Sequence, residues 1–250
     1  MIDLTGRTAL VTGGSRGIGA ATAELLAAAG ADVAITCRSR RIEAERVAER
    51  IRALGRRAHV EQGDLADPEE VARIFGEVAA TLGGLDYFIA NAGIWPEVET
   101  ALQHMPMERW QHTMRANLDA VFLSTRAALG LMQEGGSVVL VSSTAGQRGE
   151  AFHADYAATK GALISLTKSL ALECAPRLTV NCVAPGWVDT EMSASAYEDA
   201  GRARIAASIP LGRIASAADI AGPIVFLCSP LARHITGEVL NVNGGSVLCG

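Results

Sequence analysis

Tyr156 and Lys160 are four residues apart in a stretch that we expect to be helical. Residues four apart lie on one face of a helix, so the phenol and the ammonium should be neighbours. Ser143 follows a strand-like run at 137–142, and its hydroxyl could project from the end of that strand toward the same place. A phenol, an ammonium and an alcohol around one small volume suggest proton transfer to or from an oxygen atom.

One nearby cation can supply the free energy needed to lower the pKa of the phenol. A free phenol has a pKa of about 10, and acting near neutrality requires a decrease of roughly 3 units, or about 4 kcal/mol. An ammonium about 4 Å away supplies roughly 4 kcal/mol at an effective dielectric constant near 20. Burial of the phenol works in the opposite direction, so Lys160 is expected to outweigh desolvation. A lone Tyr-x-x-x-Lys is usually a pair on a helix surface, so a catalytic role for Tyr156 depends on motifs elsewhere in the chain.

A glycine-rich turn at 12–19 lies between an apolar run at 8–11 and an alanine-rich stretch at 20–29. Glycines let the backbone turn tightly and approach a ligand, and the free N–H groups at a helix start attract phosphate. A strand, a glycine-rich turn and a helix form the first half of a dinucleotide-binding unit. The glycine spacing differs from the usual G-x-G-x-x-G, which leaves a simple structural turn as the alternative interpretation.

The end of the second predicted strand, 32–37, indicates which dinucleotide binds. The residue at this place lies by the adenosine ribose, where an acidic side chain would bind the 2′-hydroxyl of NAD and repel the phosphate of NADP. Cys37 and Arg38 take that place instead. Together with Arg16 in the glycine-rich turn, Arg38 could bind a 2′-phosphate. This pattern favours NADP(H), with NAD as the alternative and a solvated helix start as the non-functional interpretation.

Strands and helices alternate along the rest of the chain, which favours a single α/β domain over residues 1–250. We expect a doubly wound parallel sheet of the Rossmann type in three layers. Residues 187–212 lack a regular pattern and are expected to be an insertion that covers the substrate. Further helices are predicted at 42–54, 68–82 with Asp67 as N-cap, 108–132, 156–174 and 217–227, and further strands at 58–60, 85–90, 137–142, 178–184 and 238–242.

Composition excludes several classes of function. The chain is 49% hydrophobic and 20% charged, enough for a large core. A net charge of −5 with interspersed signs argues against a nucleic-acid partner. The five cysteines have neither metal-ligand nor disulfide spacing, so we expect no metal site and a reducing compartment. Without a leader or an apolar run of about 18 residues, we expect a cytoplasmic protein with no membrane partner.

Taken in order, these motifs resemble the short-chain dehydrogenase/reductase family, in its compact form. The resemblance runs nearly end to end, and several ordered motifs are far more specific than any one alone. It implies an NADP(H)-dependent oxidoreductase that interconverts a ketone and a secondary alcohol. The matching positions are the turn at 12–19, Asp64, Asn91-Ala92-Gly93, Asn117, Ser143, Tyr156 with Lys160, and Pro185-Gly186.

The resemblance also assigns roles to residues. Tyr156 would be the general acid or base, Ser143 would position the carbonyl, and Lys160 would act on the phenol and bind the nicotinamide ribose. Asn117 would hold a proton-relay water through its backbone, although the residues alone suggest only a polar position within a helix. The implied cofactor-binding residues are Gly13, Ser15, Arg16, Gly17, Ile18, Arg38, Asp64, Leu65, Asn91, Gly93, Tyr156, Lys160, Pro185, Gly186, Val188 and Thr190.

Within the family, the chain resembles 3-oxoacyl-carrier-protein reductases and related carbonyl reductases. Such relatives tend to present arginines on two central helices to an acidic carrier protein, but the corresponding positions here are Gly130 and Leu172. Docking of a carrier protein is therefore not expected. Residues that could line a substrate pocket, or simply pack in the core, are Trp95, His153, Trp187 and Met192.

Two other functions are compatible with the sequence. The first is an NAD-dependent alcohol, sugar or hydroxysteroid dehydrogenase of the same family. The second is a dinucleotide-sensing protein without catalysis, which the intact set of Ser143, Tyr156 and Lys160 disfavours. Because relatives pair their central helices, we also expect a homo-oligomer, either a tetramer or a dimer.

Overall fold

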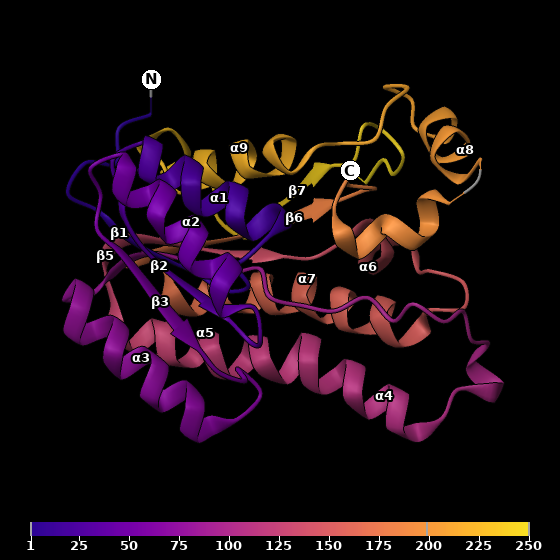
Figure 1. Ribbon diagram of the computed structural model, residues 1–250, viewed down its shortest axis with the longest axis horizontal. Coiled ribbons are helices and arrows are strands. Elements are labelled where there is room, and N and C mark those ends of the chain that lie inside the picture. Colours follow the sequence, from indigo (N-terminus) through magenta and orange to yellow (C-terminus); the bar gives the residue numbers. More distant parts are fainter. Residues whose placement is uncertain (1, 199, 250) are drawn as a thin grey trace.

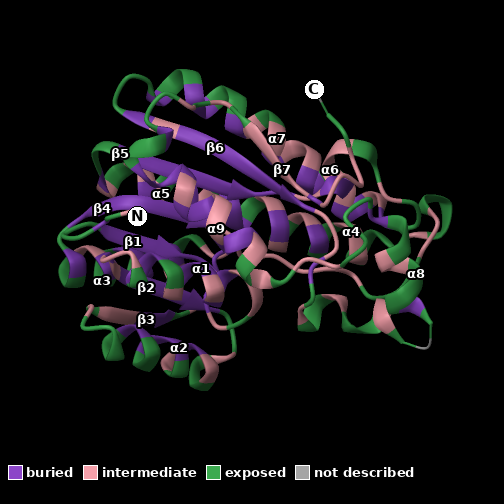
Figure 2. Cartoon of the chain, turned by 90° about the horizontal axis from the view of Figure 1, so that it is seen from above, coloured by how far each residue is buried: buried purple, intermediate pink, exposed green. Residues whose placement is uncertain are grey.

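The computed structural model describes residues 2–198 and 200–249, which form a seven-stranded sheet in the order β3-β2-β1-β4-β5-β6-β7. Every neighbouring pair of strands is parallel. Figure 2 shows the strands side by side in this order. The strands are β1 (Thr8–Val11), β2 (Asp32–Cys37), β3 (Ala58–Gln62), β4 (Leu85–Ala90), β5 (Met132–Val141), β6 (Leu178–Pro185) and β7 (Val239–Val242).

Helices cover both faces of the sheet, which confirms the predicted three-layer, doubly wound fold (Figure 1). Side chains alternate between the faces of a strand, so Leu10 and Val11 belong to different hydrophobic clusters. One face carries α1 (Gly17–Ala28), α2 (Arg41–Ala53) and α9 (Ala217–Leu227). The other carries α3 (Pro68–Leu82), α4 (Met107–Met114), α5 (Ala120–Leu131) and α7 (Ala154–Cys174).

The order of strands reverses between β1 and β4. The chain builds outward from β1 to β3 and then returns to the other side of β1. In open parallel sheets, the segments that follow the two strands at such a point diverge and leave a crevice for a ligand. The glycine-rich turn after β1 and the Asn91-Ala92-Gly93 segment after β4 both lie at this point.

The predicted helix at 108–132 is wrong in one respect, because it is not one regular α-helix. Between α4 and α5 the chain forms a π-helical turn, η2 (Arg115–Asp119). Asn117 lies in this turn and is fully buried. Its amide accepts a hydrogen bond from the backbone N–H of Ile94 at 2.7 Å and donates one to the Ile94 carbonyl at 3.0 Å. A wide turn of this kind often marks a functional site.

The remaining elements agree with the expected bounds in some places and differ from them in others. α3 has the predicted bounds because Asp67 caps it, accepting a hydrogen bond from the backbone N–H of Glu69 at 2.9 Å. A short helix, α6 (Thr144–Arg148), was not predicted; it begins after Ser143, whose hydroxyl accepts from the Ala145 N–H at 3.1 Å. β5 begins at Met132, five residues before the predicted start at 137, and α7 begins at Ala154.

The irregular region at 187–212 contains two short helices, η3 (Glu191–Tyr197) and α8 (Gly201–Ser208). Tyr197 ties η3 to the preceding segment by donating a hydrogen bond to the Val188 carbonyl at 2.9 Å. Two further short helices are η1 (Leu102–His104) and η4 (Pro230–Ala232). Within residues 2–198 and 200–249, no helix is both long and apolar enough to cross a membrane.

Candidate active site

A cleft of about 620 Å³ runs along the carboxyl ends of the strands. The segments that follow β1 to β6 all contribute to its lining. Every residue predicted to bind a cofactor lines this cleft, and so does Ser143; Asn117 does not. The structure thus brings together residues that are distant in sequence, and their individual roles remain predictions.

Tyr156, Lys160 and Ser143 meet in one corner of the cleft. Tyr156 and Lys160 lie on consecutive turns of α7 and are nearly buried, with exposed fractions of 8% and 5%. The Lys160 Nζ donates a hydrogen bond to the Val141 carbonyl at 2.8 Å and lies 5.6 Å from the centre of the Tyr156 ring. The carbonyl of Lys160 in turn accepts a hydrogen bond from the Ser142 hydroxyl at 2.7 Å, which fastens α7 to the end of β5.

Burial dominates the proton affinities of this corner. It raises the pKa of Tyr156 to about 12, against a smaller lowering by the Ser143 hydroxyl. It also lowers the pKa of Lys160 to about 8. The expectation that Lys160 outweighs desolvation is therefore wrong for the protein by itself, because the ammonium faces a backbone carbonyl and the ring rather than the phenol oxygen. Near neutral pH the phenol is protonated and the lysine is mostly charged.

Asn117 is buried behind the segment at 93–95, which lines the cleft. Gly93 separates it from the cleft, and a Cβ at Gly93 would lie 3.1 Å from the Asn117 Oδ1 and 3.6 Å from the Lys160 Nζ. The two hydrogen bonds to Ile94 fix the segment that carries Gly93 and Trp95. Asn117 thereby sets the path of the backbone beside Lys160, and its predicted water-holding role stays a prediction.

The glycine-rich turn is shaped for close backbone approach. Gly13 and Gly17 have positive φ values of +67° and +54°. A Cβ at Gly19 would lie 2.3 Å from the Gly13 carbonyl oxygen, which only glycine avoids. The Thr12 hydroxyl, for which the motif predicted no role, accepts hydrogen bonds from the backbone N–H groups of Asn91 and Ala92, both at 3.0 Å. These hydrogen bonds join the segments that follow β1 and β4, where the order of strands reverses.

Two different carboxylates contact the arginines at the nucleotide end, and the predicted binding of a 2′-phosphate by Arg16 and Arg38 stays a prediction. Arg16 was expected to act with Arg38, but Arg16 and Arg40 both contact the carboxylate of Glu191. Arg38 instead lies 3.8 Å from the carboxylate of Asp64, which also pairs with Arg115 at 3.2 Å. Sequence reasoning missed Arg40 and Glu191. The only signal for Arg40 was its place as the second of three arginines shortly after β2, and nothing in the sequence pointed to Glu191.

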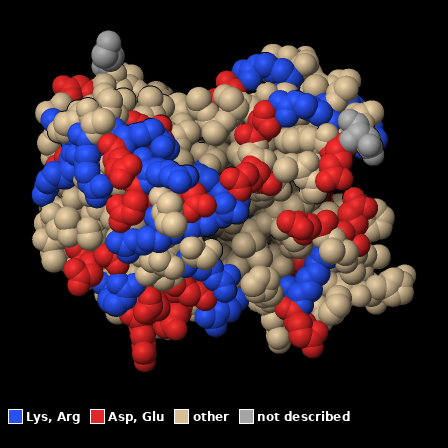
Figure 3. All heavy atoms as spheres, in the orientation of Figure 1, with Lys and Arg blue, Asp and Glu red and all other residues tan. Residues whose placement is uncertain are grey.

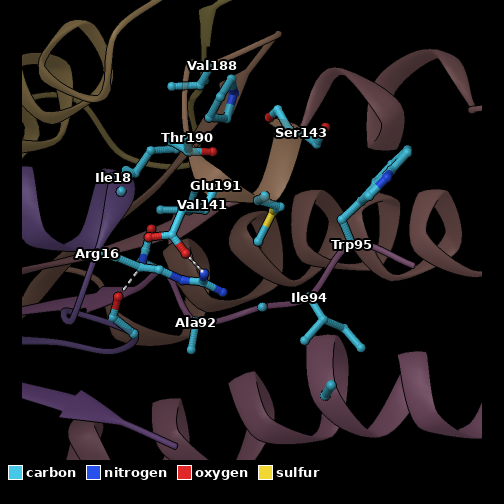
Figure 4. A pocket seen from close by; sticks show the side chains of 18 of the residues that line it. Arg16, Ile18, Ala92, Ile94, Trp95, Val141, Ser143, Val188, Thr190 and Glu191 are labelled. Atoms are coloured by element: carbon cyan, nitrogen blue, oxygen red, sulfur yellow. Dashed lines mark hydrogen bonds and ion pairs between the residues drawn. The ribbon is translucent and has the colours of Figure 1, made fainter. Parts of the chain in front are cut away.

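The opposite end of the cleft is aromatic and apolar. Trp95 stacks on His153 with ring centres 4.0 Å apart and meets Tyr156 edge-on at 4.8 Å. Of the four residues that could line a pocket or pack in the core, Trp95, Trp187 and Met192 line the cleft, whereas His153 packs behind Trp95 and its Nε2 lies 3.0 Å from the Pro96 carbonyl. In Figure 4, Trp95 and Arg16 lie on opposite sides of the pocket, with Ser143 on the same side as Trp95. An apolar end beside the phenol suits the carbon skeleton of a carbonyl compound.

The fold and site are those of a nicotinamide-dependent oxidoreductase, and comparison with known proteins agrees. The chain belongs to the short-chain dehydrogenase/reductase family; a family model described as enoyl-(acyl carrier protein) reductase matches residues 13–246. It is 41% identical to the 3-oxoacyl-[acyl-carrier-protein] reductase of Aquifex aeolicus over 98% of both chains.

Two solved structures are similar over nearly their whole length. One is a short-chain dehydrogenase from Burkholderia cenocepacia in complex with NADP, with a TM-score of 0.91, 40% identity and coverage of 97% of this chain and 98% of that chain. The other is a blue fluorescent protein from a metagenomic library in complex with NADPH, with a TM-score of 0.92, 37% identity and coverage of 98% and 100%.

Proposed function

We propose that this protein interconverts a ketone and a secondary alcohol with NADP(H), and that Tyr156 exchanges the proton with the substrate oxygen. The observation that carries the proposal is the meeting of Tyr156, Lys160 and Ser143 in a buried corner of the same cleft that holds the glycine-rich turn. When bound, NADP(H) supplies or accepts the hydride.

The residues at the other end of the cleft fit such a cofactor. The space that a Cβ would fill at Gly13 and Gly19 is closed by neighbouring atoms, so the turn is tightly folded at the start of α1, where the N–H groups of a first helical turn attract phosphate. The arginine side chains near the end of β2 suit a 2′-phosphate better than a free 2′-hydroxyl. Similarity to structures that contain NADP and NADPH supports the same choice.

The proton chemistry follows from burial. A phenol whose pKa is raised to about 12 is protonated near neutrality, so it holds the proton that a carbonyl oxygen would receive, and the transfer requires that the phenolate be stabilised. The Ser143 hydroxyl, near the phenol, would hold the same oxygen. The phenolate that forms lies near the Lys160 ammonium, which is 5.6 Å from the ring centre. An ammonium a few ångströms from a phenolate oxygen attracts it by roughly 2–4 kcal/mol at an effective dielectric constant near 20.

We infer that the substrate is a 3-oxoacyl thioester or a simpler ketone of similar shape. The apolar lining by Trp95, Trp187 and Met192 supports it, as does the activity named for the Aquifex aeolicus relative. Presentation on an acidic carrier protein is less well supported, because Leu172 is 82% exposed and Gly130 is also at the surface, so neither position offers a cation.

We also infer that copies of the chain associate through α5 and α7, as expected from the sequence. Phe122 on α5 and Leu172 on α7 are large apolar side chains with exposed fractions of 50% and 82%. Light scattering of the purified protein would give the number of subunits.

We infer, too, that the protein works in a reducing, cytoplasmic compartment. Cys37, Cys174 and Cys228, which are buried as free thiols, support this inference.

The test is Tyr156→Phe assayed with NADPH and a carrier-free 3-oxoacyl thioester. We expect turnover to fall by at least about a thousandfold while NADPH binding, followed by fluorescence, is retained. Tyr87→Phe is the matched control, because Tyr87 is equally buried but lies on β4 outside the cleft. Retained turnover in Tyr156→Phe would refute the proposed mechanism. Binding of NADPH without turnover of any ketone by the wild type would favour a sensing protein.

A further inference from the structure

The carboxylate of Glu191 holds two arginine side chains at the nucleotide end of the cleft. Its Oε2 is hydrogen-bonded to the Arg16 guanidinium and lies 3.3 Å from that of Arg40. Figure 4 shows the Glu191 carboxylate beside the Arg16 side chain. Arg16 comes from the turn after β1 and Arg40 from the segment after β2, whereas Glu191 is the first residue of η3. The contact therefore joins opposite walls of the cleft.

This contact lies where the adenosine part of a dinucleotide is expected. The segment after β2 of such a sheet borders the ribose. On the other wall, Thr190 places Glu191 over the glycine-rich turn, since a Cβ at Gly17 would lie 3.3 Å from the Thr190 methyl carbon. Figure 3 shows that blue and red side chains are intermingled over the region of α1 and α2, so acidic groups balance many of the arginines there. Glu191 is the acidic group that reaches these arginines from the irregular region at 187–212.

The ion pairs are of a kind that a stronger anion can replace. The side chains of Arg16, Arg40 and Glu191 have exposed fractions of 43%, 42% and 59%. Solvent-exposed ion pairs contribute little, because water screens the charges and both side chains lose freedom. A phosphate monoester carries about 1.5–2 negative charges near neutrality and has three acceptor oxygens, so arginine binds it more strongly than it binds one carboxylate.

We propose that Glu191 is an internal substitute for the 2′-phosphate of NADP(H) and that this phosphate displaces it from Arg16 and Arg40. The inference rests on the proposed use of NADP(H). Displacement of Glu191 subtracts from the affinity for a 2′-phosphorylated nucleotide. A nucleotide with a free 2′-hydroxyl has no group that competes for the arginines. Glu191 is thereby a specificity-determining residue, and Arg40 rather than Arg38 is the partner of Arg16 at the phosphate.

The test compares two probes that differ only by this phosphate, 2′,5′-ADP and 5′-ADP, by titration calorimetry. We expect Glu191→Gln to bind 2′,5′-ADP at least about threefold more tightly than the wild type, the scale of one or two exposed ion pairs. Its affinity for 5′-ADP should stay within about twofold. Arg40→Gln should lose affinity for 2′,5′-ADP only. Glu198→Gln is the matched control, because it removes the same charge at the end of η3 without a contact to either arginine.

Three results would overturn the inference: an unchanged preference in Glu191→Gln, an equal gain for both probes, or the same gain in Glu198→Gln. Its failure is distinguishable from failure of the proposed function. A protein that reduces ketones with NADPH while Glu191→Gln binds like the wild type refutes only the role of Glu191. A protein that shows the expected changes in binding but turns over no ketone refutes only the catalytic proposal.

Discussion

Arg109 on α4 and Asp155 on α7 form an ion pair, with the Arg109 Nε 3.0 Å from the Asp155 Oδ2. Asp155 is completely buried and also accepts a hydrogen bond from the Thr113 hydroxyl at 2.8 Å. Burial by itself would raise the pKa of Asp155, but Arg109 and Thr113 hold it below the usual value. Since Asp155 precedes Tyr156, the pair fixes the first turn of α7, which carries the phenol.

Removing Arg109 should therefore destabilise the protein strongly. We expect Arg109→Gln to lower the free energy of unfolding by about 3–5 kcal/mol, because it leaves a buried carboxylate without its cation. Adding Asp155→Asn should recover much of this loss. Urea denaturation measures both, and Arg148→Gln, which breaks the half-exposed pair with Glu150, should cost less than about 1 kcal/mol. Equal losses for Arg109→Gln and Arg148→Gln would contradict the prediction.

The rate of ketone reduction should fall as the pH rises through about 8. Burial lowers the pKa of Lys160 to about 8, so the ammonium that stabilises the phenolate is lost above that pH, whereas Tyr156 is still protonated. The loss of roughly 2–4 kcal/mol of attraction predicts a decrease of more than tenfold between pH 7 and pH 10. In Lys160→Arg this decrease should move to higher pH, and in Lys168→Arg, at an exposed position of the same helix, it should not. A flat profile in the wild type would refute the role of Lys160.

Two glycine-to-alanine changes should have opposite effects. In Gly19→Ala the new methyl would lie 2.3 Å from the Gly13 carbonyl oxygen, so the glycine-rich turn must move and nucleotide binding should weaken by at least about tenfold. Gly76 lies within α3, where a Cβ meets no atom within 4 Å. Gly76→Ala should stabilise the protein by about 0.5–1 kcal/mol and leave binding unchanged. Calorimetry and thermal unfolding report the two effects, and similar binding by both variants would contradict the steric argument.

Arginines at the two exposed helix positions should improve the use of a carrier-borne substrate. Gly130→Arg with Leu172→Arg would add the cations that are missing from α5 and α7. At low ionic strength we expect KM for a 3-oxoacyl carrier protein to fall several-fold, with little change for the carrier-free thioester. Ala72→Arg with Ala80→Arg adds the same charge to the exposed side of α3 and is the control. An equal improvement in the control would show a general effect of charge rather than docking.

Local sequence signals were enough for the fold and for the corner around Tyr156. Spacing along a helix placed Tyr156 beside Lys160, and the Asp67 cap and the glycines set the ends of elements. The signals failed where partners far apart in sequence decide the outcome. Arg16 and Glu191 are 175 residues apart, and their exposed side chains leave no periodic pattern. The proton affinity of Tyr156 depends on how completely the fold buries it, which no count of neighbouring charges gives.

The π-helical turn at Asn117 has a consequence for the helix that contains it. One additional residue in a turn shifts the phase of everything that follows by about 100° around the helix axis. The half before Asn117 faces α7, where Thr113 reaches Asp155, and the half after it directs Val121 and Ala128 into the core beneath the sheet. The two halves, α4 and α5, therefore pack against neighbours that lie in different directions. Deleting one residue from 115–119 would restore a regular spiral and turn one of these halves away from its neighbour.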